Sequence, residues 1–328
     1  MSLFNFWKGK RVFITGATGL LGSWLTQALL GKEALVIALV RDKIPRTYPH
    51  LTPWYDQVVR IAGEVENYFL LERILNEYEI DTVFHIAAQT IVPIANNNPI
   101  STFKSNIEGT WNLLEACRRN PQVKRILVAS SDKAYGTQEK LPYTEEAPLR
   151  GIHPYDVSKS CADLITIAYH RSYGLPVSVT RCANLFGGGD LNFNRLVPGT
   201  IQAAFQNESP VIRSDGKMIR EYFYVKDAVG AYLHLAEQME AKNVFGESFN
   251  FGSDLKLPVA EMARKILKII NKTKLDLTIL NQAANEIPEQ WLSSEKARRL
   301  LDWHPRYSLE EGLAETVEWY RIFFKDRR

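Results

Sequence analysis

Residues 11–22 read RVFITGATGLLG. The first five form a short apolar run typical of a buried strand, and residues 23–30 have the composition of a helix. Gly16, Gly19 and Gly22 therefore lie where a strand gives way to a helix. Glycine permits the tight turn and the close backbone approach that such a junction requires. The segment predicts a βα unit at the start of an α/β fold.

The same alternation continues through the first half of the chain. Short apolar runs recur at residues 34–40, 82–86, 125–129 and 177–181, each bounded by turn or helix signals. Strands that alternate with helices form a parallel sheet covered on both faces. We therefore expect an α/β fold with a Rossmann-type, doubly wound parallel sheet.

The pattern changes after about Cys182. Loops become rich in Gly and Asn, with helices predicted near residues 196–205 and 259–270, while residues 221–225 and the helix expected at 227–237 look like a return to the sheet. We predict a dinucleotide-binding domain at residues 1–182 together with about 220–240. A smaller, discontinuous substrate-binding region is predicted at about 183–219 and 241–328.

Composition excludes several classes of function. Lys and Arg total 40 against 37 Asp and Glu, a net charge of +3 that is too small to indicate a nucleic-acid or membrane surface. The sequence contains no apolar run of the length that spans a membrane. Cys117, Cys161 and Cys182 are too widely spaced to indicate a disulfide framework or a zinc site. We expect a cytoplasmic protein without a metal.

The glycine segment also predicts a ligand. Free N–H groups at a helix N-terminus attract an anion, so the turn fits a dinucleotide pyrophosphate, although a tight turn without a ligand has the same pattern. The predicted contacts are Gly16, Thr18, Gly19, Leu20, Leu21 and Gly22.

Two further positions bear on the cofactor. Arg41-Asp42 ends the second expected strand, where a carboxylate binds a ribose 2′-hydroxyl and an arginine accepts a 2′-phosphate, so NAD and NADP both remain open. Glu64 and Val65 follow the third strand and are expected near the adenine. Solvated surface charges remain the alternative for Arg41, Asp42 and Glu64.

Tyr155 and Lys159 stand four residues apart and so share one helix face. A neighbouring ammonium is expected to lower the phenol pKa from about 10 toward neutrality, which would make Tyr155 a usable base. A coincidental exposed pair has the same spacing. Ser131, Asp132 and Lys133 lie a short way upstream and add a hydroxyl, a carboxylate and an amine.

Taken in this order, the glycine motif, Ser131 and Tyr155-x-x-x-Lys159 resemble the extended short-chain dehydrogenase/reductases. The nucleotide-sugar branch of that family is similar at residues 85–89 (HIAAQ), 106–110 (NIEGT), 181–187 (RCANLFG) and 220–227 (REYFYVKD). The resemblance implies NAD or NADP, tightly bound and recycled, and a nucleotide-sugar substrate. It also implies a homodimer formed by helices near residues 100–118 and 155–171, although a core-facing stripe within one chain has the same periodicity.

The resemblance assigns roles to individual residues. Ser131, Tyr155 and Lys159 would form the redox triad, and Lys159 would also hold the nicotinamide ribose. Asn106 would orient Lys159, and Ala87, Ala88 and Gln89 would line the pyrophosphate. For Arg220 a surface ion pair with Glu221 or Asp227 is the alternative, and Asp227 is expected to be structural. The implied substrate contacts are Gln89, Ser131, Asn184, Arg195, Leu196, Arg213 and Arg220.

Asp132 and Lys133 indicate the subclass. In this family, 4-epimerases generally carry small or apolar residues after the serine, whereas 4,6-dehydratases carry an acid/base pair. The Asp-Lys pair and residues 6–12 and 303–306 are most similar to CDP-glucose 4,6-dehydratases. Residues 212–217 resemble other nucleotide-sugar enzymes instead, and Arg41 resembles GDP-mannose 4,6-dehydratases and favours NADP. CDP-glucose is therefore favoured, with UDP-N-acetylglucosamine and GDP-mannose open.

The implied chemistry uses each group once. Tyr155 takes the 4-hydroxyl proton, Lys133 removes the C5 proton, and Asp132 protonates the departing 6-hydroxyl, giving a 4-keto-6-deoxy sugar. A solvated turn pair is the alternative for Asp132 and Lys133. A 4-epimerase or 4-reductase of the same fold and a non-catalytic nucleotide sensor also stay open, although a sensor has no need of a redox triad.

Overall fold

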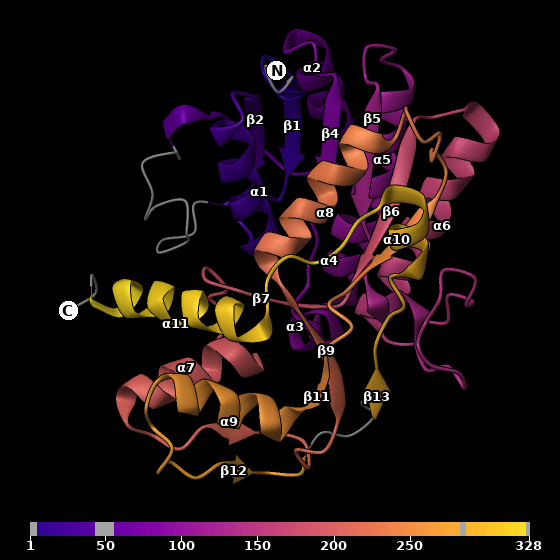
Figure 1. The fold of residues 1–328 in the computed structure, drawn as a ribbon. Coiled ribbons are helices and arrows are strands. Elements are labelled where there is room, and N and C mark those ends of the chain that lie inside the picture. The colour runs from indigo at the N-terminus through magenta and orange to yellow at the C-terminus, as the bar shows by residue number, and fades with distance from the viewer. Residues whose placement is uncertain (1–4, 43–55, 283–286, 326–328) are drawn as a thin grey trace.

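The computed structural model describes residues 5–42, 56–282 and 287–325. A seven-stranded sheet fills its upper part (Figure 1), in the order β10-β6-β5-β4-β1-β2-β3. Every neighbouring pair in this sheet is parallel, which confirms the predicted doubly wound α/β fold. The strands are β1 (Arg11–Thr15), β2 (Leu35–Val40), β3 (Val59–Ala62), β4 (Thr82–His85), β5 (Arg125–Ala129), β6 (Val177–Cys182) and β10 (Ser248–Phe251).

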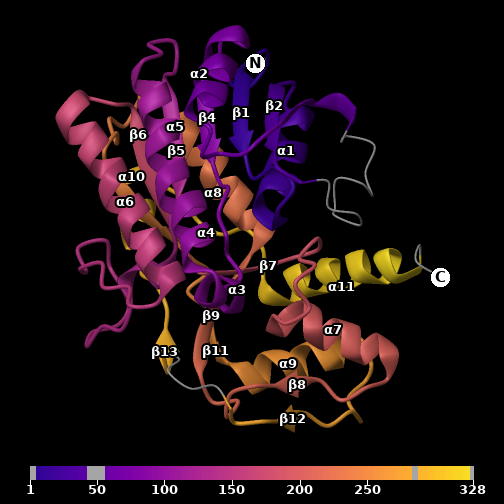
Figure 2. The ribbon, with the colours of Figure 1, turned by 180° about the vertical axis from the view of Figure 1, so that it is seen from behind.

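Helices cover both faces of the sheet. Figure 1 shows α1 (Leu20–Gly31), α8 (Val225–Gln238) and α10 (Glu295–Leu301) on the near face, and Figure 2 shows α2 (Tyr68–Glu77), α5 (Gly109–Arg118) and α6 (Pro154–Tyr173) on the other. Val12 and Ile14 join the apolar core beneath α1, while Phe13 joins the core beneath α5. Because both faces are buried, the inner strands β1, β2 and β5 are nearly continuous apolar runs instead of alternating.

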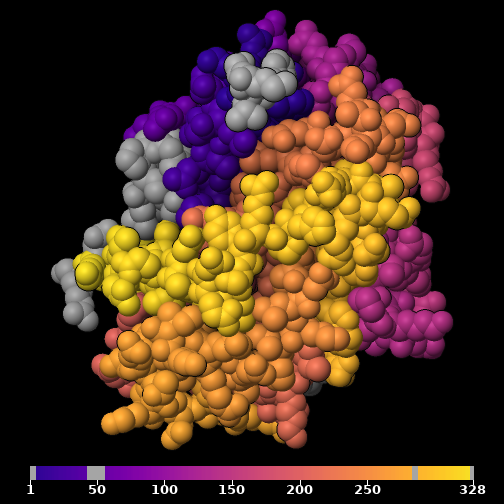
Figure 3. Space-filling model, in the orientation of Figure 1, coloured from indigo at the N-terminus to yellow at the C-terminus, as the bar shows by residue number. Residues whose placement is uncertain are grey.

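A smaller region lies below this sheet (Figure 1). β7 (Asn184–Phe186), β9 (Ile219–Tyr224), β11 (Lys256–Pro258) and β13 (Glu289–Gln290) form a second sheet, and β8 (Val211–Ile212) pairs with β12 (Thr278–Ile279). The C-terminal segments cross the face where the upper and lower parts meet (Figure 3). The remaining helices are α3 (Val92–Asn97), α4 (Pro99–Phe103), α7 (Leu196–Gln206), α9 (Val259–Ile269) and α11 (Leu309–Lys325).

One expectation about the second half is corrected. The strand expected at residues 221–225 does not return to the main sheet, because β9 pairs with β7, β11 and β13 instead. The helix after it, α8, does pack on α1 and β5, and β10 adds the edge strand beside β6. Residues 248–251, predicted in the substrate-binding region, thus complete the main sheet. The other boundaries of the two regions stay a prediction.

No helix in the described ranges is long and apolar enough to cross a membrane.

Candidate functional site

The predicted site residues follow the carboxyl ends of neighbouring strands. Arg41 follows β2, Ala87 follows β4 and Ser131 follows β5. In open α/β sheets, ligands bind at this edge, where the strand order reverses. Here the order reverses at β1, because the chain runs outward from it to β2 and β3 on one side and to β4 and β5 on the other. The topology therefore gathers the predicted cofactor and catalytic residues at one edge.

The turn after β1 has no space for a side chain at Gly16 or at Gly22. Gly16 has a φ of +78°, and a Cβ there would lie 2.7 Å from the backbone nitrogen of Ala87. A Cβ on Gly22 would lie 2.1 Å from the carbonyl oxygen of Gly16. Gly19 precedes α1 without a side-chain cap, and the first turn of α1 carries no acidic residue. This bare helix N-terminus fits a pyrophosphate, so the residues present suit NAD or NADP.

The residues predicted near the cofactor ribose and adenine are held less tightly by their surroundings than the glycine turn. Arg41 Nε lies 2.7 Å from Asp42 Oδ2, and both side chains are exposed. Glu64 is exposed, whereas Val65 is buried and packs so closely on Gly109 that a Cβ there would lie 2.4 Å from Val65 Cγ1. Val65 thus supports the backbone near the proposed adenine site.

A buried hydrogen-bond chain runs from β1 to the segment after α4. The Thr110 hydroxyl donates to the Asn106 carbonyl at 2.7 Å, so its oxygen accepts from His85 Nε2 at 2.9 Å. His85 Nδ1 is then the acceptor that faces Thr15 Oγ1 at 2.8 Å. Burial lowers the pKa of His85 to about 3, with a smaller effect of Lys159, so the ring stays neutral. The resemblance at residues 85–89 did not predict this role of His85 in linking β4 to β1 and Thr110.

Asn106 lies in a π-helical turn, Lys104–Glu108. Its Oδ1 accepts from the Gln89 backbone N–H at 2.7 Å, and its Nδ2 donates to the Gln89 carbonyl at 3.1 Å and to Ser158 Oγ at 2.8 Å. Ser158 donates in turn to the Tyr155 carbonyl at 2.7 Å. Asn106 therefore contacts α6, the helix that carries Tyr155 and Lys159, through Ser158. The Gln89 side chain itself accepts from the Ile91 backbone N–H at 3.0 Å.

Tyr155 and Lys159 share one face of α6, as their spacing predicted, and both are buried. Burial lowers the pKa of Lys159 to about 8, and its Nζ donates to the Ala129 carbonyl at 2.7 Å. Burial raises the pKa of Tyr155 to about 12, against a smaller opposite effect of its hydrogen bond with Ser131. The expected lowering of the phenol pKa by Lys159 is thus wrong, because burial raises that pKa and the charges of Asp132 and Asp156 add to the rise.

Ser131, Asp132 and Lys133 form a compact turn after β5. The Ser131 hydroxyl donates to Asp132 Oδ1 at 3.0 Å and accepts from the Lys133 backbone N–H at 3.2 Å. Asp132 is 2% exposed, and its Oδ2 has no hydrogen-bond partner among the described residues. Burial raises the pKa of Asp132, against the attraction of Lys133. A buried carboxyl of this kind is suited to carry a proton.

Sequence reasoning missed two residues beside this turn. Lys133 Nζ donates to Gln290 Oε1 at 2.9 Å, although Gln290 lies 157 positions further along the chain. Asp156, next to Tyr155, is also buried, and burial raises its pKa against the attraction of Lys133. Gln290 belongs to a two-residue strand with no periodicity, so no sequence signal marked it.

Arg195 and Arg213 are both held by local contacts. Arg195 binds Asp190 Oδ2 at 2.7 Å and the Leu185 carbonyl at 2.9 Å, just before Leu196 begins α7. Arg213 is exposed and donates to Asn194 Oδ1 at 2.7 Å. Asn184 stands in register with Tyr222 across β7 and β9.

Arg220 lies in β9 beside Gln290 of β13, and its charge acts on Asp132. Glu221, one of its proposed ion-pair partners, accepts from the Leu292 and Asp254 N–H groups, both at 2.8 Å. Asp227 accepts from the Arg306 N–H at 2.7 Å and from the Tyr307 N–H at 3.3 Å, which confirms a structural role.

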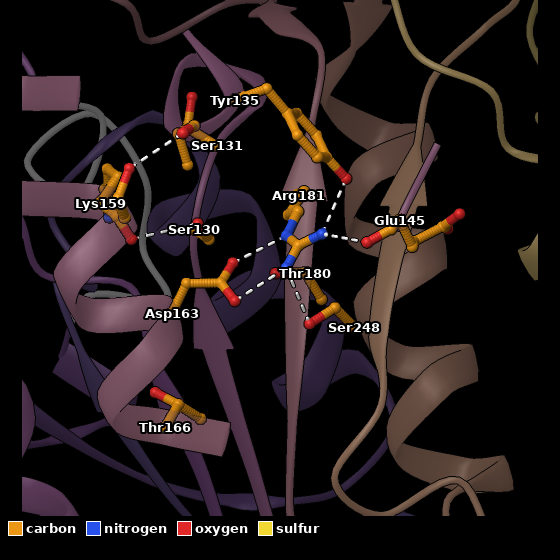
Figure 4. A network of polar contacts seen from close by, with 12 residues as sticks. Ser130, Ser131, Tyr135, Glu145, Lys159, Asp163, Thr166, Thr180, Arg181 and Ser248 are labelled. Carbon is orange, nitrogen blue, oxygen red and sulfur yellow. Dashed lines mark hydrogen bonds and ion pairs between the residues drawn. The ribbon is translucent and has the colours of Figure 1, made fainter. Parts of the chain in front are cut away.

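Arg181 connects the site to the main sheet (Figure 4). Its Nε and Nη2 donate to the two oxygens of Asp163 on α6 at 2.7 and 2.9 Å. Its Nη1 donates to Tyr135 Oη at 2.8 Å, and its Nη2 also donates to Ser248 Oγ at 3.2 Å. One buried guanidinium therefore fixes α6, β10 and the turn after Ser131 relative to β6.

Comparison with known proteins agrees with this geometry. A family model described as GDP-mannose 4,6 dehydratase matches residues 13–316. The chain belongs to this family. It is 31% identical to CDP-glucose 4,6-dehydratase of Salmonella typhimurium, over 98% of this chain and 93% of that protein. The chain is thus an extended short-chain dehydrogenase/reductase of the nucleotide-sugar 4,6-dehydratase branch.

Solved structures of this fold include more than one activity. A dTDP-glucose 4,6-dehydratase of Bacillus anthracis in complex with NAD has a TM-score of 0.85 at 28% identity, covering 96% of this chain and 97% of that one. An epimerase of Methanothermobacter thermautotrophicus has a TM-score of 0.90 at 29% identity, covering 98% and 95%. The fold therefore does not distinguish dehydration from epimerisation in this family.

Proposed function

We propose that this protein is a nucleotide-hexose 4,6-dehydratase that converts a nucleotide-activated sugar to its 4-keto-6-deoxy derivative. The observation that carries the proposal is Asp132, a buried carboxyl with a raised pKa and an unpartnered oxygen beside Ser131 and Lys133. Oxidation and reduction at C4 need no such acid. Elimination of water requires one, together with a base.

Each side chain has one task in the proposed reaction. Tyr155, oriented by Ser131, acts as a phenolate: it first gives its own proton to solvent, against its raised pKa, and then takes the proton of the 4-hydroxyl as C4 is oxidised to a ketone. The ketone acidifies the C5–H bond, Lys133 removes that proton, and Asp132 gives its proton to the 6-hydroxyl, which leaves as water. Hydride added at C6 and a proton added at C5 reduce the C5–C6 double bond, so the net change from the starting sugar to the product is the loss of one water.

NAD or NADP, when bound, would accept hydride from C4 and return it to C6. The turn at Gly16, Gly19 and Gly22 would hold its pyrophosphate, and Lys159 its nicotinamide ribose. Because hydride is returned within one turnover, we propose that the cofactor stays bound and is recycled. Denaturing the purified protein and separating the released nucleotide by chromatography distinguishes NAD from NADP, which Arg41 and Asp42 together leave open.

CDP-glucose is the favoured substrate. Support comes from the Asp132-Lys133 pair and from the similarity to CDP-glucose 4,6-dehydratase over nearly the whole chain. Asn184, Arg195, Leu196, Arg213 and Arg220 are the proposed nucleotide-sugar contacts, and UDP-N-acetylglucosamine and GDP-mannose remain alternatives.

We also propose a cytoplasmic homodimer. Large apolar side chains are exposed on the adjoining helices α4, α5 and α6, with exposed fractions of 71% at Ile100, 42% at Trp111 and 60% at Leu164. Such a patch is unusual on a monomer. Residues 99–118 form one continuous helical stretch, so this stretch and α6 from each of two copies would bury the patch in a four-helix interface. Sedimentation of the wild type and of Leu164→Glu tests this, since the variant should shift toward monomer.

The function is tested by incubating the purified protein with CDP-glucose, UDP-N-acetylglucosamine, dTDP-glucose and GDP-mannose, with and without added NAD and NADP. Mass spectrometry should show the loss of one water from one of them. An unchanged mass with a changed sugar in chromatography would establish the epimerase alternative. Oxidation of added NADH or NADPH would instead indicate a reductase, and no reaction would favour a nucleotide sensor.

A further inference from the structure

Gln290 lies outside the predicted site yet contacts the proposed base. It is fully buried, and its Oε1 accepts from Lys133 Nζ at 2.9 Å. A lysine side chain carries only donors, so this contact fixes the amide with its oxygen toward Lys133. Gln290 also stands in register with Arg220 in parallel strands, which places both side chains on the same face of the second sheet.

The other end of this amide has no partner. Gln290 Nε2 is buried and meets no acceptor in the part of the chain that the structure describes, and Asp132 Oδ2 likewise meets no donor. Burying an unpaired amide is costly, because its interactions with water are lost without replacement. An apolar side chain of the same size would avoid that cost, so the amide is explained by what it does for Lys133.

The Gln290 amide carries no charge, and this matters because its partner, Lys133, is the proposed base. Lys133 must lose a proton before it can accept one, and a carboxylate at this position would stabilise the ammonium by direct attraction. Two carboxyl groups already act on Lys133, namely Asp132 in its own turn and Asp156 on α6. Arg220 on β9 acts on Asp132 with the opposite charge. An amide oxygen holds the amine in place without adding a third negative charge.

We propose that Gln290 is a positioning residue that directs Lys133 at the sugar C5 through a neutral hydrogen bond, without placing a further negative charge beside the amine. The inference rests on the dehydratase function proposed above.

The test is the pH profile of Gln290→Glu, measured as loss of the C5 hydrogen to solvent. The added carboxylate should move the rising limb of this profile to higher pH by about one unit or more. Formation of reduced nicotinamide by substrate, which reports oxidation at C4, should be unchanged. Gln206→Glu is the matched control, because it makes the same charge change at the exposed end of α7 and should leave the profile in place.

Gln290→Met is a second variant that tests the same role even if Gln290→Glu does not fold. It keeps the length of the side chain and removes the acceptor, so exchange at C5 should slow about tenfold or more while the KM stays within about twofold. Labelling of Lys133 by an amine reagent, followed by peptide mass spectrometry across pH, should require higher pH in Gln290→Glu than in the wild type.

Unchanged pH profiles and unchanged exchange in both variants, with a wild type that does release water, would overturn the role of Gln290. Equal loss of C4 oxidation and C5 exchange in Gln290→Met would also overturn it, because that result indicates a general structural defect. A wild type that releases no water would instead refute the proposed dehydratase function, so the two failures are distinguishable.

Discussion

Asn106 Nδ2 donates to Ser158 Oγ at 2.8 Å, and this bond joins the π-helical turn to the helix that carries Tyr155 and Lys159. Ser158 is fully buried, so its hydroxyl has no water to replace a lost partner. Ser158→Ala should destabilise the protein by about 1–2 kcal/mol and lower kcat with little change in KM. Chemical unfolding and steady-state kinetics measure the two effects.

Thr166→Val is the control for this change. Thr166 is buried on the same helix, and its hydroxyl donates to the Ala162 carbonyl at 2.6 Å, away from the site. It should leave kcat unchanged. A kcat that falls equally in both variants would show that Asn106 and Ser158 have no specific link to the catalytic helix.

Lys133→Ala should abolish water loss and leave reduction of nicotinamide by substrate detectable, because the base acts only after oxidation at C4. Tyr155→Phe should block both steps, since it removes the group that takes the 4-hydroxyl proton. Absorbance of reduced nicotinamide and product mass in one reaction separate these outcomes. Equal loss of both steps in Lys133→Ala would refute its assigned role.

Asp132→Asn should slow elimination by about 100-fold or more with little change in substrate affinity. The sign of the pH effect follows from the raised pKa of Asp132, since the acid works only while protonated. In the wild type, elimination should therefore fall as pH rises through that pKa, and the variant should lack this falling limb. A large loss of binding with intact chemistry would contradict the assignment.

Gly22→Ala should prevent cofactor binding, because its Cβ would lie 2.1 Å from the Gly16 carbonyl oxygen that shapes the turn. Gly31→Ala, in the same helix, meets nothing within 4 Å and is the control. The nucleotide retained after purification measures the difference. If Gly22→Ala kept as much nucleotide as Gly31→Ala, the turn would not be the pyrophosphate site.

Asp163→Ala should destabilise the protein by about 3–5 kcal/mol, because it leaves the buried Arg181 guanidinium without its carboxylate. Arg73→Ala removes an exposed pair with Glu77 on α2 and should change stability little. Urea unfolding of both variants checks the contrast. Similar small losses would show that the network in Figure 4 does not hold the site together.

Local patterns predicted the parts of the molecule that local chemistry determines. The strand, turn and helix at residues 11–31 follow from apolar runs and glycine spacing, and the shared helix face of Tyr155 and Lys159 follows from their separation. Parallel topology then explains why residues at several strand ends meet at one edge.

Features that depend on tertiary contacts were not predictable in this way. β10 completes the main sheet far along the chain, and Gln290 reaches Lys133 from a strand too short to have a period. The pKa of Tyr155 was expected to fall, but burial raises it, and burial is not visible in a spacing of four residues.

The most direct measurement of the central claim is the reaction of CDP-glucose, or of whichever nucleotide sugar is accepted, in D2O. Mass spectrometry should show that the product has lost one water. NMR should show that it has gained one deuterium at C5, since Lys133 exchanges the proton that it removes with solvent. A product of unchanged mass without deuterium at C5 would contradict elimination and with it the acid/base roles of Asp132 and Lys133.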